Sequence, residues 1–215
     1  MLSHIRVVDF CSGVSQFAGH LLARLGAEVI AVEPPTGVTT RHMGPYANNT
    51  PDPNRSLTHW AYNCGKKSVI LDIEVQRDKE KFCDLLRGSD ILLEDCHPEY
   101  LASLGLSIKE LSQINPKLIH ASITPYGSNG PRSHWLGTDL TAAAGSSFMY
   151  ASGDADRAPL RVGLPHSFLH GAADAAAASL IALHERSRSG LGQHIDVSAQ
   201  ESLTFGFPQI VAPLE

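Results

Sequence analysis

A chain of 215 residues, 43% apolar and 18% charged, can bury an ordinary hydrophobic core and does not have the composition of a disordered segment. Its formal net charge of −5 argues against broad binding to nucleic acid or to an anionic membrane, because both need a basic face. The four cysteines form no Cys-x-x-Cys pair, and no apolar run approaches the roughly 20 residues of a membrane span. These features predict a reduced, cytoplasmic protein with no nucleic-acid or membrane partner.

Five short runs rich in Val and Ile predict strands that are buried on both faces of a sheet. Segments of helical period lie between several of these runs. One covers residues 17–25 and ends at Gly26, and another covers residues 79–86 and ends at Gly88. The alternation predicts an α/β fold, a Rossmann-like, mostly parallel sheet with helices on both faces, which binds ligands at the carboxyl ends of its strands. The five runs are residues 5–10, 28–32, 68–71, 91–94 and 118–123.

Two longer segments interrupt this alternation. Residues 34–62 are rich in Pro, Asn, Gly and Thr, which predicts a long excursion from the sheet of the kind that is often functional. Residues 167–186 are Ala-rich and predict the longest helix. No internal repeat is present, so residues 1–215 are interpreted as one domain portion. The closing pair Leu214 and Glu215 is compatible with a junction left by an expression vector, which leaves the natural end open.

Five phrases in a fixed order resemble the class III CoA-transferase family. This family includes formyl-CoA transferase, carnitine CoA-transferases and the α-methylacyl-CoA racemases. The resemblance runs from about Arg6 to about Ser202, and its strength comes from the order of phrases that are weak singly. The phrases are VVDFCSGVSQFAGHLLARLGAEVIAVEPPTGVTTRHMGP, NCGKKSVILD, DILLEDCHPEYLASLGLSIKEL, LIHASITPYGSNGP and HERSRSGLGQHIDVS.

The resemblance implies a domain organisation. Members of the family have a Rossmann-like large domain, a smaller second domain, and a dimer whose subunits pass through each other like linked rings. They are about twice as long as this chain, which therefore corresponds to the N-terminal portion of the large domain, without the small domain and the C-terminal return. An isolated large domain exposes apolar surface that is normally covered, so we expect self-association.

The resemblance also implies contacts to CoA or acyl-CoA, the substrate. The pyrophosphate and ribose phosphate of CoA need cations or backbone N–H donors. Arg41, Lys66 and Lys67 are the candidate cations, and solvated loop cations are the alternative interpretation. Cys96 and His97 complete the candidate binding residues.

Two features limit the ligand prediction. Together with Asp95, Cys96 and His97 stand where the family shows Asn, an aromatic residue and Arg, which weakens the contacts expected there. A nicotinamide site on the first loop, with Glu33 as ribose ligand, is disfavoured because the loop lacks G-x-G-x-x-G.

The catalytic residue of the family is missing. In these transferases an Asp attacks the acyl-CoA thioester, which gives a mixed anhydride and then an aspartyl-CoA thioester. Counting forward from Val162-Gly163-Leu164-Pro165, and back from residues 184–186, places Phe168 at that position. A phenyl ring forms no anhydride, and loss of a covalent nucleophile costs on the order of a millionfold in rate.

The racemase branch of the family gives no substitute. Its proton-shuttling His falls on Thr138, whose hydroxyl is not basic near neutral pH. His170, oriented by Asp174, is a weak candidate for a general base. His166, His170 and Asp174 together are a weak candidate for a metal site. A local polar pair is the simpler interpretation, so no catalytic residue and no metal are predicted.

Three functions remain open at this point. The first is a CoA-transferase-like domain that retains CoA binding without the nucleophile, as the non-catalytic half of a longer or paired enzyme whose other half carries the Asp. The second is an active acyl-CoA transferase, racemase or lyase that uses other residues. The third is an interaction module without a ligand.

Overall fold

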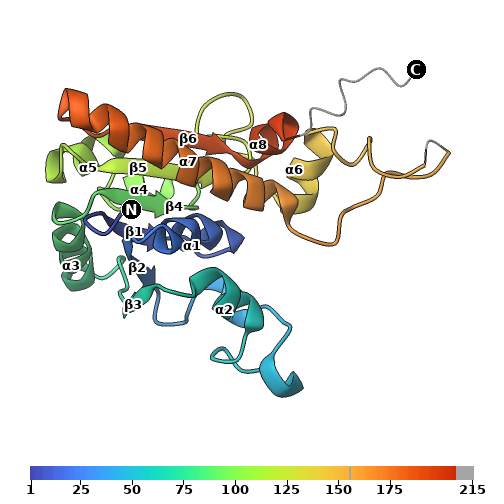
Figure 1. The fold of residues 1–215 in the computed structure, drawn as a ribbon, viewed down its shortest axis with the longest axis horizontal. Helices are drawn as coiled ribbons and strands as arrows, with labels where there is room; N and C mark the ends of the chain where they lie inside the picture. Colours follow the sequence, from blue (N-terminus) through green and yellow to red (C-terminus); the bar gives the residue numbers. More distant parts are fainter. Residues whose placement is uncertain (155, 207–215) are drawn as a thin grey trace.

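The chain folds around a six-stranded, wholly parallel sheet (Figure 1). The computed structural model describes residues 1–154 and 156–206, so Leu214 and Glu215 lie outside the described residues. The strand order is β3-β2-β1-β4-β5-β6, which confirms the predicted Rossmann-like α/β fold. The strands are β1 (Arg6–Phe10), β2 (Glu28–Glu33), β3 (Lys67–Ile70), β4 (Ile91–Glu94), β5 (Ile119–Thr124) and β6 (His194–Ser198).

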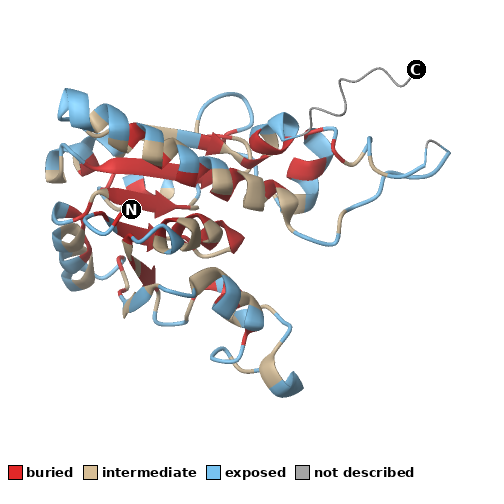
Figure 2. Ribbon diagram, viewed as in Figure 1, coloured by how far each residue is buried: buried red, intermediate tan, exposed pale blue. Residues whose placement is uncertain are grey.

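Helices cover both faces of the sheet and give it two hydrophobic cores. On one face Val7, Leu93 and Ile123 pack under α1 and α7, and on the other face Val8 and Leu92 pack under α3, α4 and α5. All residues of β4 and β5 are buried, as the red central strands of Figure 2 show. Burial on both faces explains the apolar run of residues 91–93 in β4, whereas β5 alternates apolar with polar residues. The helices are α1 (Phe17–Arg24), α2 (Leu57–Asn63), α3 (Gln76–Arg87), α4 (Tyr100–Ser103), α5 (Ile108–Ile114), α6 (Asp139–Gly145), α7 (His166–Ser189) and α8 (Ala199–Phe205).

Helix α7 lies close to the sheet because small residues line its buried face. A Cβ atom on Gly171 would stand 3.3 Å from Cγ2 of Ile123 and 3.4 Å from Cα of Ala199, so little space separates the three elements. The helix ends at Gly190, whose φ of 76° is a left-handed conformation that glycine adopts without strain. The buried small residues are Gly171, Ala172, Ala175, Ala176, Ser179 and Ala182.

The strand order creates a crevice at the carboxyl ends of the strands. From β1 the chain proceeds to β2 and β3 on one side, and it later returns to β4 and β5 on the other side. The loops that leave the carboxyl ends of β1 and β4 therefore diverge, and parallel sheets bind ligands at such a point. The sixth strand, His194–Ser198, and the extension of β5 to Thr124 were not among the predicted strands.

Candidate functional site

A cleft opens at the carboxyl ends of β1 and β4. It consists of two adjoining hollows of about 350 and about 460 Å³, which share Ser12, Asp95 and Cys96. We call their union the strand-end cleft. The smaller hollow extends toward α7 and ends at Phe168 and Trp135, and the larger extends past Pro34 toward the ends of β2 and β3. The cleft therefore lies where the strand order predicts a ligand.

Asp95 occupies the centre of the strand-end cleft. Its Oδ1 accepts the backbone N–H of Ser12 at 2.8 Å, and its Oδ2 accepts that of Gly13 at 3.0 Å. Burial, with smaller contributions from the nearby Glu94 and Asp9, raises the pKa of Asp95 to about 6 against the lowering effect of these two N–H donors. The carboxylate thus ties the loop after β4 to the loop after β1. Sequence reasoning named Asp95 only as a departure from the family pattern.

Phe168 lies at the start of the long helix α7. It is the third residue of α7, it is partly buried, and its side chain lines the smaller hollow of the cleft. The start of α7 is held by Asp139, whose Oδ1 accepts the backbone N–H of Ser167 at 2.8 Å. An aromatic ring is therefore fixed at the helix start, beside the strand ends.

Thr138 has a structural role. It is the N-cap of α6, and its Oγ1 accepts the backbone N–H of Thr141 in a capping box. A capping hydroxyl without a neighbouring base does not abstract an α-proton.

The His170 and Asp174 candidates do not form a catalytic pair. No hydrogen bond or ion pair joins these two side chains in the described part of the chain, and neither lines the strand-end cleft. His170 lies instead against Gly206, which follows α8, and Asp174 is exposed. Within residues 1–154 and 156–206 no group of three or more His, Cys, Asp and Glu side chains is arranged to hold a metal ion.

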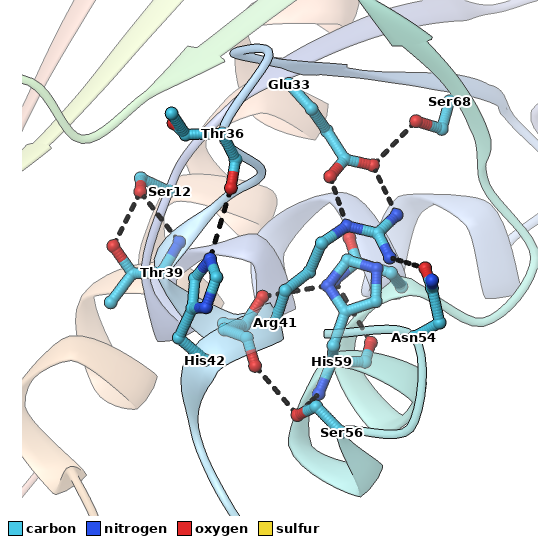
Figure 3. A network of polar contacts seen from close by, with 12 residues as sticks. Ser12, Glu33, Thr36, Thr39, Arg41, His42, Asn54, Ser56, His59 and Ser68 are labelled. Carbon is cyan, nitrogen blue, oxygen red and sulfur yellow. Dashed lines mark hydrogen bonds and ion pairs between the residues drawn. The ribbon is translucent and has the colours of Figure 1, made fainter. Parts of the chain in front are cut away.

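Arg41 is fastened to the end of β2 (Figure 3). Its guanidinium binds both carboxylate oxygens of Glu33, with NH2 2.8 Å from Oε1, and NH1 reaches Oδ1 of Asn54 at 3.4 Å. Burial raises the pKa of Glu33, but hydrogen bonds from Arg41 and Ser68 outweigh it and hold the pKa below its ordinary value. The bidentate pair anchors the excursion of residues 34–62, and the charge of Arg41 is already matched.

Lys66 is buried and fully bonded. Its ammonium lies 2.6 Å from Oδ2 of Asp9, 2.7 Å from the backbone oxygen of Gln16 and 3.0 Å from Oδ1 of Asn63. The Lys66 and Asp9 side chains are 1% and 0% exposed. The sequence predicted Lys66 as a phosphate ligand, but all three N–H donors of its ammonium are used inside the fold.

Lys67 points to the other end of the sheet. It opens β3, and its ammonium lies 2.6 Å from Oε1 of Glu28, the first residue of β2. The side chain is 71% exposed. Because the strands are parallel, this pair lies at their amino ends, away from the strand-end cleft.

Cys96 and His97, which the sequence named as candidate binding residues, line the cleft. The backbone N–H of Cys96 donates to Glu94 Oε2 at 2.7 Å. Burial, together with the charges of Glu94 and Asp95, raises the pKa of the Cys96 thiol far above its ordinary value, so the sulfur stays protonated and weakly nucleophilic. His97 is exposed at the rim of the cleft.

A second polar cluster is formed by side chains of β4, β5 and β6, and it was not predicted from the sequence. Ser122 Oγ lies 2.9 Å from Nε2 of His194 and 3.3 Å from Nε2 of His120, which is itself 3.3 Å from Oε1 of Glu94. A hydrolytic triad needs one imidazole nitrogen on the serine and the other on the carboxylate. Here Nε2 of His120 faces both groups, so the cluster does not form a triad. In the sequence, the polar residues at every second position of β5 were the signal that could have indicated this cluster.

Another hollow, of about 700 Å³, lies at the amino ends of the strands. Arg186 crosses it, with NH2 2.7 Å from Oδ1 of Asp90 and NH1 2.9 Å from the backbone oxygen of Lys117. These bonds join the end of α7 to the starts of β4 and β5. We interpret this hollow as a structural junction, because the ligand end of a parallel sheet is the opposite one.

Comparison with known proteins decides the family. The sequence profile of CoA-transferase family III matches residues 2–210. The chain belongs to CoA-transferase family III. It is 40% identical over 201 residues to succinyl-CoA:(R)-benzylsuccinate CoA-transferase subunit BbsE of Thauera aromatica, covering 93% of this chain and 49% of that protein. It is 38% identical to acetyl-CoA:oxalate CoA-transferase of Acetobacter aceti, covering 85% of this chain and 46% of the relative.

Solved structures of the family agree with the fold. A CaiB/BaiF family protein from Brucella suis superposes with a TM-score of 0.88 at 29% identity, over 95% of this chain and 55% of that chain. A Mycobacterium tuberculosis protein superposes with a TM-score of 0.86 at 31% identity, over 98% and 58%. This family III chain spans about half the length of the curated relatives that it matches. Within its described residues no helix has the length and apolar character needed to cross a membrane.

Proposed function

We propose that this chain is the non-catalytic half of a paired or longer family III CoA-transferase, in which the other half carries the attacking acid. One observation carries the proposal: Phe168 lines the strand-end cleft at the start of α7, where the family resemblance places the Asp nucleophile. The anhydride mechanism needs an oxygen nucleophile at that place, and an aromatic ring supplies none.

The relatives support a division of labour between chains. The Thauera aromatica relative is by its name a subunit, and its name assigns it to a transferase that uses succinyl-CoA. By the same reasoning CoA thioesters are the substrates of the complete enzyme to which this chain contributes. Residues 1–215 are then its N-terminal large-domain portion. Self-association and a cytoplasmic setting stay predictions.

A second candidate function rests on Asp95. This carboxylate lines the same hollow as Phe168, so it is a possible replacement nucleophile or proton carrier in an active acyl-CoA enzyme. Two backbone N–H donors already hold it, at 2.8 and 3.0 Å, so both of its oxygens are engaged in hydrogen bonds inside the fold. The non-catalytic role is therefore the better supported of the two.

Activity measurements separate the two functions. The chain is assayed for CoA transfer from succinyl-CoA or acetyl-CoA, alone and mixed with a family III chain from the same genome that carries Asp at the position matching Phe168. We expect transfer only in the mixture, with loss on changing the partner's Asp to Asn and no loss with Phe168→Tyr in this chain. Turnover by this chain alone, abolished by Asp95→Asn, would establish the second function and refute the first.

A further inference from the structure

The strand-end cleft has the wrong charge for CoA. Of the described residues that line it, none is Lys or Arg, and three are carboxylates: Asp72, Glu74 and Asp95. Among these described lining residues, the one imidazole is that of His97, at the rim of the smaller hollow. CoA brings a pyrophosphate and a ribose phosphate, so this lining opposes its most highly charged part.

Among the described residues, no ion pair neutralises these carboxylates. Oδ1 of Asp72 accepts the backbone N–H of Glu74 at 3.1 Å, and Oε1 of Glu74 accepts the hydroxyl of Tyr100 at 3.3 Å. Asp95 accepts only backbone N–H groups from Ser12 and Gly13. In the part of the chain that the structure describes, no ion pair involves any of the three.

Two of the backbone donors that suit a phosphate are also occupied. In parallel α/β folds the turn after the first strand presents N–H groups to an anion at the start of the next helix. In this chain that turn is Cys11–Gly13, and its Ser12 and Gly13 N–H groups both point at Asp95. The carboxylate is thus an internal anion in the place that a phosphate would need.

The cations expected to compensate are used elsewhere. Arg41 is bound to Glu33, Lys66 is buried against Asp9, and Lys67 faces Glu28 at the amino end of the sheet. Recruiting Lys66 would leave a fully buried carboxylate without its partner, which is strongly unfavourable.

From this arrangement we propose that this chain excludes CoA, because Asp95 fills the backbone N–H site after β1 and the unpaired carboxylates Asp72 and Glu74 repel the phosphates. If the proposed function holds, on which this step rests, the partner half binds all of the CoA in the complete enzyme. The residues present do not fit the ligand that the family implies.

The test is isothermal titration of the chain with CoA, beside pantetheine, which lacks the phosphates. We expect no CoA binding up to about 1 mM. The triple variant Asp72→Asn, Glu74→Gln, Asp95→Asn is expected to gain at least about tenfold in affinity for CoA and to leave pantetheine affinity unchanged, because the lost repulsion acts on phosphate alone.

Two further variants keep the test decisive. The pair Asp84→Asn with Glu185→Gln removes two exposed carboxylates outside the cleft, so it matches the net-charge change of Asp72→Asn with Glu74→Gln and is expected to gain nothing. If thermal melting shows the triple variant unfolded, Asp72→Asn with Glu74→Gln leaves the Asp95 contacts intact, and we expect about a fivefold gain.

Wild-type binding of CoA tighter than about 1 mM would overturn the inference, and so would a folded charge-reduced variant with unchanged affinity. The outcome is separable from that of the proposed function. CoA binding by a chain that still shows no turnover removes only this inference, whereas turnover by the chain alone removes the proposed function.

Discussion

Replacement of Lys66 by Met tests whether this lysine is a structural cation or a ligand group. In the structure its ammonium makes three bonds, to Asp9 at 2.6 Å, Gln16 O at 2.7 Å and Asn63 at 3.0 Å, with the lysine side chain 1% exposed. Removing one member of a buried ion pair leaves an uncompensated charge and costs about 3–5 kcal/mol. We therefore expect Lys66→Met to lower the free energy of unfolding by that amount in urea denaturation followed by circular dichroism.

The adjacent lysine provides a matched control. Lys67 also pairs with a carboxylate at 2.6 Å, but it is 71% exposed, and exposed ion pairs contribute at most about 1 kcal/mol. Lys67→Met should therefore be nearly neutral. Equal and small losses in both variants would refute the structural role of Lys66 and return it to the candidate ligands.

Three other expectations follow from the same geometry. Gly19→Ala places a Cβ atom 2.3 Å from Oδ2 of Asp9, so it should lower the free energy of unfolding by about 1–3 kcal/mol, measured in urea. The fold raises the pKa of Asp95 from 3.8 to about 6, so the contribution of protonated Asp95 to the free energy of unfolding is complete below pH 3.8 and is lost as the pH rises through 6. The free energy of unfolding of Asp95→Asn should therefore increase relative to that of the wild type from pH 4 to pH 7. A difference between the two proteins that does not change with pH would contradict this. Arg186→Met breaks the bond to Asp90 at 2.7 Å and should cost about 1–3 kcal/mol in thermal or urea unfolding.

Much of the fold was accessible from the sequence because the central strands are buried on both faces. Continuous apolar runs such as residues 91–94 have few alternatives, and strands were found at all five predicted runs. The missed strand β6 lies at the edge of the sheet, where only Val197 is fully buried and polar His194 and Asp196 interrupt the run. A strand whose faces are only partly buried gives a weaker apolar pattern.

The site was predictable in position but not in its charge pairing. Counting residues placed Phe168 at the start of a long helix, and the structure places it in the cleft. The pairing of Lys66 with Asp9 joins residues 57 positions apart, and that of Asp95 with Ser12 joins residues 83 apart. Such long-range partners depend on the strand order, which local patterns do not encode. The sequence therefore presented Arg41, Lys66 and Lys67 as free cations, whereas in the fold each forms an ion pair with a carboxylate.

Intact-protein mass spectrometry of the chain incubated with acyl-CoA tests whether the chain lacks the attacking acid, because the anhydride mechanism that the family resemblance implies leaves an acyl or CoA group on the attacking carboxylate. We expect the wild-type chain to keep an unchanged mass after incubation with succinyl-CoA or acetyl-CoA. A covalent acyl or CoA adduct on the wild-type chain, mapped by peptide analysis to any carboxylate of the strand-end cleft, would contradict this expectation.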